Sequence, residues 1–305
     1  DGTLANFHAL FPAMSADGRY VAYHSRATNL VSGDTNNSSD VFIYDRLTGQ
    51  TSRVSVASDG TQGNGYSYFP TISAYGRYVA FGSYADNFVN KDTNIDDVFV
   101  HDRQTGETSL ISLAYDGSLG DDYSGSPSIS ADGRYVAFDS SATNLVSNDT
   151  NLEIDVFVHD RQTGQTKRVS VASDGTQGNK GSSGPTISAD GRYIAFVSKA
   201  SNLVSGDTND EFDVFVHDQQ TGQTSRVSVS SNGTQGNSIS GGNAISADGR
   251  YVVFESFANN LVSADTNNMW DIFFHDRQTG MTSRVSVSSN GTQGNGASGS
   301  PSLSA

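Results

Sequence analysis

Cysteine is absent from the 305 residues, so neither disulfides nor thiolate metal sites are available to this chain. Lysine occurs only at four positions, and the formal net charge is −15. Binding to nucleic acid phosphates requires a basic surface, so this composition excludes nucleic acid as a partner. No apolar run is long enough to cross a bilayer as a helix, which argues against membrane insertion. The abundance of Ser, Thr, Asn, Asp and Gly with so little Lys predicts an extracellular, cell-surface or periplasmic protein.

One hexapeptide, Ser-Ala-x-Gly-Arg-Tyr, divides the chain into repeats. It begins at Ser15, Ser73, Ser130, Ser188 and Ser246. A fixed period of this size indicates a repeat architecture. The approximate repeats are 15–72, 73–129, 130–187, 188–245 and 246–303, within a single domain spanning 1–305. Residues 1–14 and 290–305 duplicate the same part of the repeat, so one copy of that segment is surplus in a five-unit arrangement.

Each repeat contains four strand candidates and no helical periodicity. In the third repeat they are Pro127–Ser130, Arg134–Phe138, Asp155–His159 and Lys167–Val171. All five prolines occupy the first segment, which suits the first residue of a strand, where no ladder N–H is needed. The middle two strands are apolar on both faces, which indicates cover on both sides. The last strand alternates, which predicts Arg168 and Ser170 on its exposed face.

Four short antiparallel strands per repeat, covered on both faces by neighbouring repeats, predict a β-propeller blade. The run Pro-x-Ile-Ser-Ala-Asp-Gly-Arg-Tyr-Val-Ala-Phe, then Asp-Val-Phe-Val-x-Asp and a Thr-Gly turn, resembles the TolB-type β-propeller repeat. The resemblance implies an all-β propeller, although rings of that family commonly have six blades. We predict five blades from the repeat count, with six blades or a longer array as alternatives. The resemblance does not specify function, because such blades serve many functions.

An additional loop in each repeat, with the pattern Asp-x-Asn-x-x-x-Asp, places hard oxygen ligands at alternating positions, as calcium sites do. A structural calcium ion is therefore one interpretation. The alternative is that the same side chains form Asx-turns and cap loop N–H groups. The candidate metal ligands are Asp34, Asn36 and Asp40; Asp92, Asn94 and Asp97; Asp149, Asn151 and Asp155; Asp207, Asn209 and Asp213; and Asp265, Asn267 and Asp271.

Histidine precedes Asp at the end of the third strand in four repeats, as His101, His159, His217 and His275, with Tyr44 in the first repeat. Four equivalent pairs cannot form one active site, so we interpret them as anchors of strand ends. Loop amides beside Tyr66, Tyr68, Tyr115 and Tyr123 suggest contacts with glycans, whereas a solvated connector is the alternative. We find neither a Gly-x-Ser-x-Gly elbow nor a His-x-x-x-His motif.

The repeated polar residues favour a protein that is not an enzyme, because catalysis requires a single constellation. Our main hypothesis is a structural or assembly protein that joins head to tail through terminal strand exchange, forming fibres. The expected assembly residues are Leu4, Phe7, Leu10, Phe11, Pro301 and Leu303. The alternative is a multivalent lectin-like module with one site per blade. We thus expect self-association, glycans as the other candidate partner, and no cofactor other than calcium.

Overall fold

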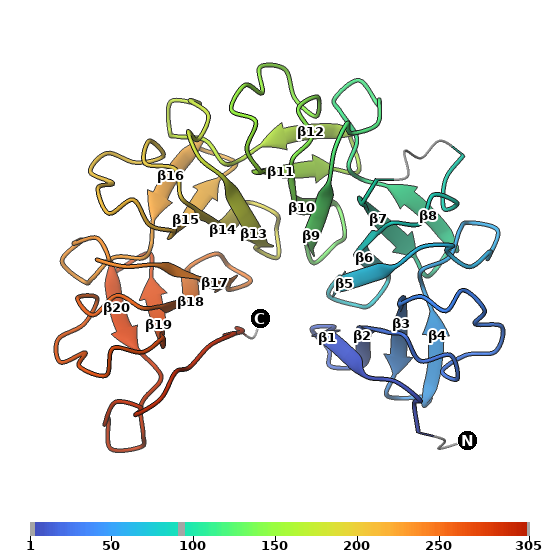
Figure 1. The fold of residues 1–305 in the computed structure, drawn as a ribbon, viewed down its shortest axis with the longest axis horizontal. Coiled ribbons are helices and arrows are strands. Elements are labelled where there is room, and N and C mark those ends of the chain that lie inside the picture. Colours follow the sequence, from blue (N-terminus) through green and yellow to red (C-terminus); the bar gives the residue numbers. More distant parts are fainter. Residues whose placement is uncertain (1–3, 91–94, 304–305) are drawn as a thin grey trace. The chain divides into compact units, whose positions relative to one another are not determined.

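The computed structural model describes residues 4–90 and 95–303, and within them the strands form five four-stranded antiparallel sheets (Figure 1). Each sheet is one blade, named blade 1 to blade 5 in chain order, as expected for a five-bladed β-propeller. The chain divides into two compact units, 1–149 with 158–167, and 150–157 with 168–305. Blades 1 and 2 belong to the first unit, and blades 4 and 5 belong to the second. The predicted all-β fold and blade composition are confirmed.

Strands follow one another in sequence order across each blade. The first strands are β1 (Ala9–Met14), β5 (Ser67–Ile72), β9 (Ser124–Ile129), β13 (Ser182–Ile187) and β17 (Ser240–Ile245). The second strands are β2 (Tyr20–Ser25), β6 (Tyr78–Ser83), β10 (Tyr135–Ser140), β14 (Tyr193–Ser198) and β18 (Tyr251–Ser256). The third strands are β3 (Asp40–Asp45), β7 (Asp97–Asp102), β11 (Asp155–Asp160), β15 (Asp213–Asp218) and β19 (Asp271–Asp276). The fourth strands are β4 (Gln50–Arg53), β8 (Glu107–Leu110), β12 (Gln165–Arg168), β16 (Gln223–Arg226) and β20 (Met281–Arg284).

Proline lies inside the first strand rather than at its start, which corrects the prediction from sequence. In β5 the pairing with β6 shifts register between Tyr68 and Thr71, on either side of Phe69 and Pro70. A bulge of this kind leaves residues without a ladder partner. Proline, which has no N–H, therefore removes no ladder hydrogen bond there. Phe69 adopts a left-handed φ of 46°, a conformation that costs a non-glycine residue about 1 kcal/mol.

The prediction that Arg168 and Ser170 face solvent is wrong. The Arg168 side chain is 10% exposed and Ser170 is fully buried. The Ser170 hydroxyl donates to Oδ1 of Asp155 at 2.6 Å, which fastens the segment after the fourth strand to the start of the third. The same bond joins Ser112 to Asp97 and Ser228 to Asp213. Polar residues at these positions are therefore internal links and not a solvated edge.

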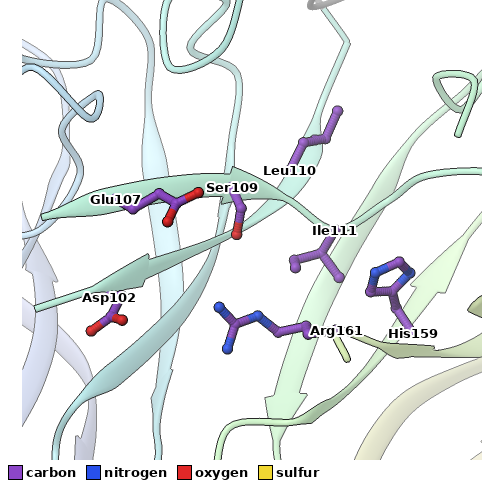
Figure 2. A pocket seen from close by; sticks show the side chains of 7 residues that line it. All are labelled: Asp102, Glu107, Ser109, Leu110, Ile111, His159 and Arg161. Carbon is purple, nitrogen blue, oxygen red and sulfur yellow. The ribbon is translucent and has the colours of Figure 1, made fainter. Parts of the chain in front are cut away.

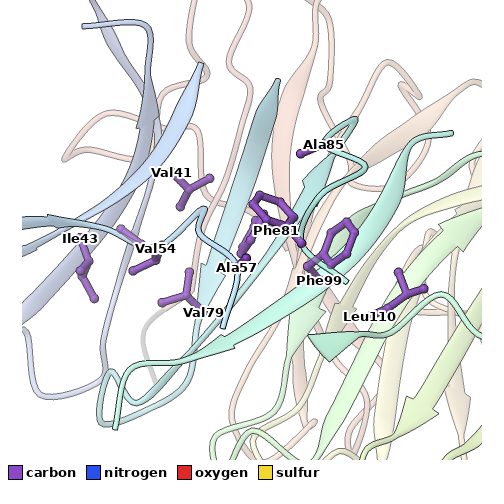
Figure 3. Close-up of a cluster of buried hydrophobic side chains, with 11 residues drawn as sticks. Val41, Ile43, Val54, Ala57, Val79, Phe81, Ala85, Phe99 and Leu110 are labelled. Atoms are coloured by element: carbon purple, nitrogen blue, oxygen red, sulfur yellow. The ribbon is translucent and has the colours of Figure 1, made fainter. Parts of the chain in front are cut away.

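The hydrophobic core lies between successive blades. Figure 3 shows Val41 and Val54 of blade 1 packed toward Phe81 and Phe99 of blade 2. Phe81 and Phe99 are fully buried, and their rings stack with centroids 6.1 Å apart. Blades 1 and 2, and likewise blades 4 and 5, therefore bury their apolar side chains against each other, and this explains why the second and third strands are apolar on both faces.

The junction between blades 1 and 2 includes a cation–π contact, a close approach of a glycine to a ring and a hydrogen bond between the blades. The Arg103 guanidinium of blade 2 lies 4.3 Å from the centroid of the Tyr20 ring of blade 1. A Cβ atom on Gly76 would collide with that ring, so a glycine is required. The Thr108 hydroxyl donates to the Val56 carbonyl at 2.5 Å. Equivalent contacts join blades 4 and 5, through Arg277 over Tyr193 and Thr282 to Val229.

Candidate binding site in the first three blades

The Asp-x-Asn-x-x-x-Asp loops hold their carboxylates against cationic and amide donors from the same blade. In blade 4, Arg226 Nη1 lies 3.3 Å from Asp207 Oδ1 and 3.5 Å from Asp213 Oδ2. Gln235 Nε2 donates to both of these oxygens at 2.8 Å. Burial raises the pKa of Asp213, and the hydrogen bonds from Ser228 and Gln235 and the charge of Arg226 counteract that effect. The position between the two carboxylates is thus filled by donors, which does not fit a cation.

The asparagine of the loop makes the predicted Asx-turn. Asn209 Oδ1 accepts the backbone N–H of Glu211 at 3.1 Å, and its Nδ2 donates to Gly236 O at 2.9 Å. Asn36 and Asn267 make the same pair of bonds in blades 1 and 5. Among the described residues, no group of three or more His, Asp or Glu side chains is arranged to hold a metal. The calcium prediction stays untested, and these contacts give it no support.

The remaining loop candidates take equivalent places. In blade 3, Asp155 Oδ2 lies 3.4 Å from Arg168 Nη1. The set Asp34 and Asp40 faces Arg53, and the set Asp265 and Asp271 faces Arg284. Asp149 and Asn151 lie in the corresponding loop of blade 3, as sequence alignment places them. Asp92 and Asn94 of blade 2 lie outside the described residues, whereas Asp97 begins β7.

The repeated histidines anchor strand ends, as their repetition indicates. His101 Nδ1 lies 2.9 Å from Thr108 Oγ1, the hydroxyl that donates to blade 1, and His159 makes the same contact with Thr166. Burial lowers the pKa of each of these histidines, so they are neutral near pH 7. A pocket between blades 2 and 3 is lined by His159 together with Glu107 and Arg161 (Figure 2). Its Arg161 stacks on Tyr78 at 4.4 Å and donates to Gly133 O at 2.7 Å, so this cation belongs to the blade junction.

A contiguous row of aromatic side chains runs over blades 1 and 2, and we call it the aromatic row. The Phe11 and Phe69 rings meet edge to face at 4.4 Å, and Phe69 meets Tyr68 at 5.1 Å. Tyr68 in turn contacts Tyr66 at 5.3 Å and Tyr84 at 6.3 Å. Tyr68 is buried, whereas Phe11, Tyr66, Phe69 and Tyr84 are exposed by 57%, 40%, 37% and 54%. An exposed cluster of this kind is a candidate binding surface.

Two buried carboxyl groups, which we call the acid pair, lie behind the aromatic row. The Tyr68 hydroxyl donates to Asp96 Oδ2, and Asp96 Oδ1 has no hydrogen-bond partner among the described residues. Asp96 is 3% exposed, and Asp139 of β10 is 4% exposed. Burial, with the charges of Asp97 and Asp139, raises the pKa of Asp96 to about 8. Asp96 is therefore largely a neutral acid at pH 7, able both to donate and to accept a hydrogen bond.

Glycines make room for the two tyrosines of this site. Tyr68 lies opposite Gly82 in the β5–β6 register, and a Cβ on Gly82 would crowd its ring. A Cβ on Gly125 would collide with the hydroxyl of Tyr123. Burial and the charge of Asp139 raise the pKa of Tyr123, so its hydroxyl keeps its proton. Both tyrosines thus present hydroxyl groups to buried carboxyls at the junction of blades 2 and 3.

Within residues 4–90 and 95–303, the site occurs once because the repeats differ at these positions. The places of Tyr68 and Phe69 are taken by Ser183 and Gly184 in blade 4, and by Gly241 and Gly242 in blade 5. Sequence analysis singled out Tyr66, Tyr68 and Tyr123 but missed Tyr84, Phe69, Asp96 and Asp139. The available signal was departure from the repeat consensus. Tyr115, the fourth predicted tyrosine, is 64% exposed and takes no part in the aromatic contacts described above.

The predicted assembly residues occupy two separate segments. Leu4, Phe7, Leu10 and Phe11 are all at least half exposed, and the last two lie in β1. Pro301 and Leu303 are partly buried in segment 298–303, which forms no strand. That segment is nevertheless tied to blade 5, because Ser298 N donates to Trp270 O at 2.7 Å.

Searches with family models and curated protein sequences found no match for this chain. Solved structures do resemble it. TolB from Acinetobacter baumannii is 19% identical, with 90% of this chain and 53% of that chain covered, and a TM-score of 0.52. The putative TolB from Agrobacterium tumefaciens is 16% identical, with 92% and 81% covered, and a TM-score of 0.54. The chain therefore spans about half the length of the first and most of the second.

Enzymes also share this architecture. Oligogalacturonate lyase from Vibrio parahaemolyticus is 12% identical, with 93% of this chain and 67% of that chain covered, and a TM-score of 0.55. Identities this low establish the fold alone. The chain has a TolB-like β-propeller fold, as its repeat motif indicated. Among the described residues, no helix is long and apolar enough to cross a membrane.

Proposed function

We propose that this chain is a non-catalytic binding propeller that holds a carbohydrate at the aromatic row and acid pair. The observation that carries the proposal is the connection through Tyr68. Its ring contacts the exposed Phe69, Tyr66 and Tyr84, while its hydroxyl binds the buried Asp96. Binding sites combine apolar and aromatic surface with a few fixed polar groups that orient the ligand. Sugar rings have apolar faces that stack on aromatic side chains and hydroxyls that pair with carboxyl groups.

A neutral, hydroxyl-bearing ligand suits this site better than a cation does. The net charge of −15 and the exposed rings favour cations in general. However, the raised pKa of Asp96 keeps this carboxyl largely uncharged at pH 7. A sugar hydroxyl both donates and accepts, so it can satisfy a neutral carboxylic acid in either role.

The proposal replaces one site per blade with a single site. Equivalent positions in blades 4 and 5 carry small residues such as Gly184 and Gly242, which provide no stacking surface. Catalysis is not proposed, because Asp96 is hydrogen-bonded to Tyr68 and the repeated histidines are engaged at blade junctions. The composition supports an extracellular, cell-surface or periplasmic location, which is part of the proposal.

Binding to an array of neutral and acidic oligosaccharides, followed by calorimetry with the best ligand, tests the function. We expect one site per chain. Tyr84→Ala and Tyr66→Ala should each weaken binding about tenfold, which corresponds to about 1.4 kcal/mol. Tyr75→Ala is the matched control, because Tyr75 is 79% exposed in the turn at the opposite end of the β5–β6 pair.

Three results would contradict the proposal. They are the absence of any oligosaccharide ligand, tighter binding of a lysine-rich peptide than of any sugar, and equal losses in Tyr84→Ala and Tyr75→Ala. Mass spectrometry of the ligand after incubation checks the non-catalytic part, since a cleaved product would identify an enzyme.

A further inference from the structure

Segment 298–303 has the backbone of a first strand although it belongs to no sheet in the described structure. Ser300 has a φ of 56°, close to the 46° of Phe69 at the bulge of β5. Ser300 N donates to Glu255 Oε2 at 2.9 Å, as Phe69 N donates to His24 Nδ1 at 3.2 Å. The segment therefore sits on blade 5 as β5 sits on blade 1.

A serine pair shows which strand this segment matches. In blades 2 to 5, the first and second strands are joined by a buried hydrogen bond between two serine hydroxyls, such as Ser67 with Ser83 at 2.9 Å and Ser240 with Ser256 at 2.9 Å. Blade 1 lacks this bond, because Ala9 lies opposite Ser25. The Ser25 hydroxyl keeps only the bond to a backbone carbonyl, that of His8, which its equivalents such as Ser83 and Ser256 also make. Ser298 aligns with Ala9 in the repeat and carries the hydroxyl that Ala9 lacks.

The face of blade 5 beyond this segment carries the residues of a blade junction. Val285 takes the place of Val54 and Val227, which are 1% exposed beneath the next blade. Blade 1 carries the complementary residues Gly18 and Arg46, equivalent to Gly76 and Arg103 at the junction of blades 1 and 2. The surfaces on blades 5 and 1 are thus the two halves of the repeated interface.

We propose that segment 298–303 of one copy of this chain replaces β1 in a second copy. The segment pairs with β2 of that copy, and Ser298 bonds to Ser25. Blade 1 of the second copy then packs on blade 5 of the first, covering Val285. The docked segment holds the bulge geometry before pairing, which reduces the ordering cost of the exchange. Because donor and acceptor surfaces differ, the contact is heterologous and builds chains of subunits.

Two engineered disulfides test the exchange, and the absence of native cysteine makes them unambiguous. Ala9→Cys with Ser25→Cys fastens β1 to β2, and Ser182→Cys with Ser198→Cys is the matched control in blade 4. In sedimentation velocity across a concentration series, we expect the wild type and the blade 4 control to assemble. The blade 1 variant should stay monomeric when oxidised and should assemble after reduction.

A second variant acts on the donor side without altering the fold. Val285→Glu places a charge on a half-exposed side chain and should prevent assembly. An equimolar mixture of this variant with the oxidised blade 1 variant should form dimers and nothing larger, because only one competent donor and one competent acceptor remain. A monomeric wild type at every concentration would overturn the proposal. Assembly of the oxidised blade 1 variant, or a mixture without dimers while the wild type assembles, would do the same.

Discussion

Asp96 and Asp139 interact electrostatically: burial, with the charges of Asp97 and Asp139, keeps the pKa of Asp96 near 8. Both carboxyl groups are shielded from solvent at the junction of blades 2 and 3. In an unfolded chain, Asp96 would ionise near pH 4. The folded state therefore binds a proton that the unfolded state releases, and the stability of the fold depends on pH over this interval.

The free energy of unfolding should fall as the pH rises from 4 to 8. In this interval the folded state keeps the Asp96 proton and the unfolded state has lost it, so each rise in pH favours the unfolded state. We expect Asp96→Asn to flatten this dependence, so that the variant gains about 4 kcal/mol relative to wild type between pH 5 and pH 8.5. Chemical denaturation at each pH measures the effect. Asp122→Asn, on an exposed neighbouring loop, should retain the wild-type profile. A parallel pH profile for Asp96→Asn and wild type would contradict the assignment.

The Arg–Asp pairs act with the opposite sign in a different pH window. Hydrogen bonds from Arg134 lower the pKa of Asp160 to about 2, and those from Arg77 do the same for Asp102. A carboxyl group whose pKa is lowered in the folded state stabilises the fold above about pH 4. This contribution is lost as the pH falls toward 2 and the carboxylate is protonated. We therefore expect Asp160→Asn to lower the melting temperature at pH 7, with a smaller difference from wild type at pH 2.5. A constant difference would be inconsistent with the pairing.

The fold could be predicted from the sequence because the same structural signals occur in every repeat. Five copies of Ser-Ala-x-Gly-Arg-Tyr established the period, and the doubly apolar second and third strands indicated cover by neighbouring blades. The bulge at Phe69 and Pro70 could not be derived, because proline is compatible with several strand positions. The burial of Ser170 was missed because an alternating pattern cannot distinguish a serine in water from one bonded to a buried Asp155.

The candidate site was harder to predict because it occupies positions where the repeats disagree. Averaging over the repeats emphasised the loop carboxylates and histidines, which the structure shows engaged within blades and at their junctions. Asp96 replaces Ser39 of blade 1 and Phe212 of blade 4, and Asp139 replaces Gly82 of blade 2. Only folding brings such single substitutions together, since Tyr68 and Asp139 are far apart in sequence. In this chain, the residues that deviate from the repeat are therefore our functional candidates.

The loop carboxylates should depend on their arginine rather than on calcium. Arg226→Leu leaves Asp207 and Asp213 buried without their cation, and breaking such a buried pair costs about 3–5 kcal/mol. Blade 2 carries Leu110 and Leu119 at the positions of Arg226 and Gln235, which gives the substitution a natural precedent in this chain. Wild-type melting temperature should be the same in chelator and in millimolar calcium. A calcium-dependent increase in the wild type would restore the metal interpretation.

Glycine at the blade junction should be far less replaceable than glycine in an open turn. Gly76 has a φ of 72°, and its Cβ position overlaps the Tyr20 ring of blade 1. Gly106 has a φ of 79° with nothing near its Cβ position, so it isolates the backbone cost. Gly106→Ala should therefore lower the free energy of unfolding by about 1–2 kcal/mol, because alanine is strained in the left-handed conformation. Gly76→Ala must in addition displace Tyr20 from beneath Arg103, and we expect it to cost about 1–3 kcal/mol more, as overpacking does. Chemical denaturation of the two variants measures the difference, and equal losses would show that the Tyr20 contact does not hold the blades together.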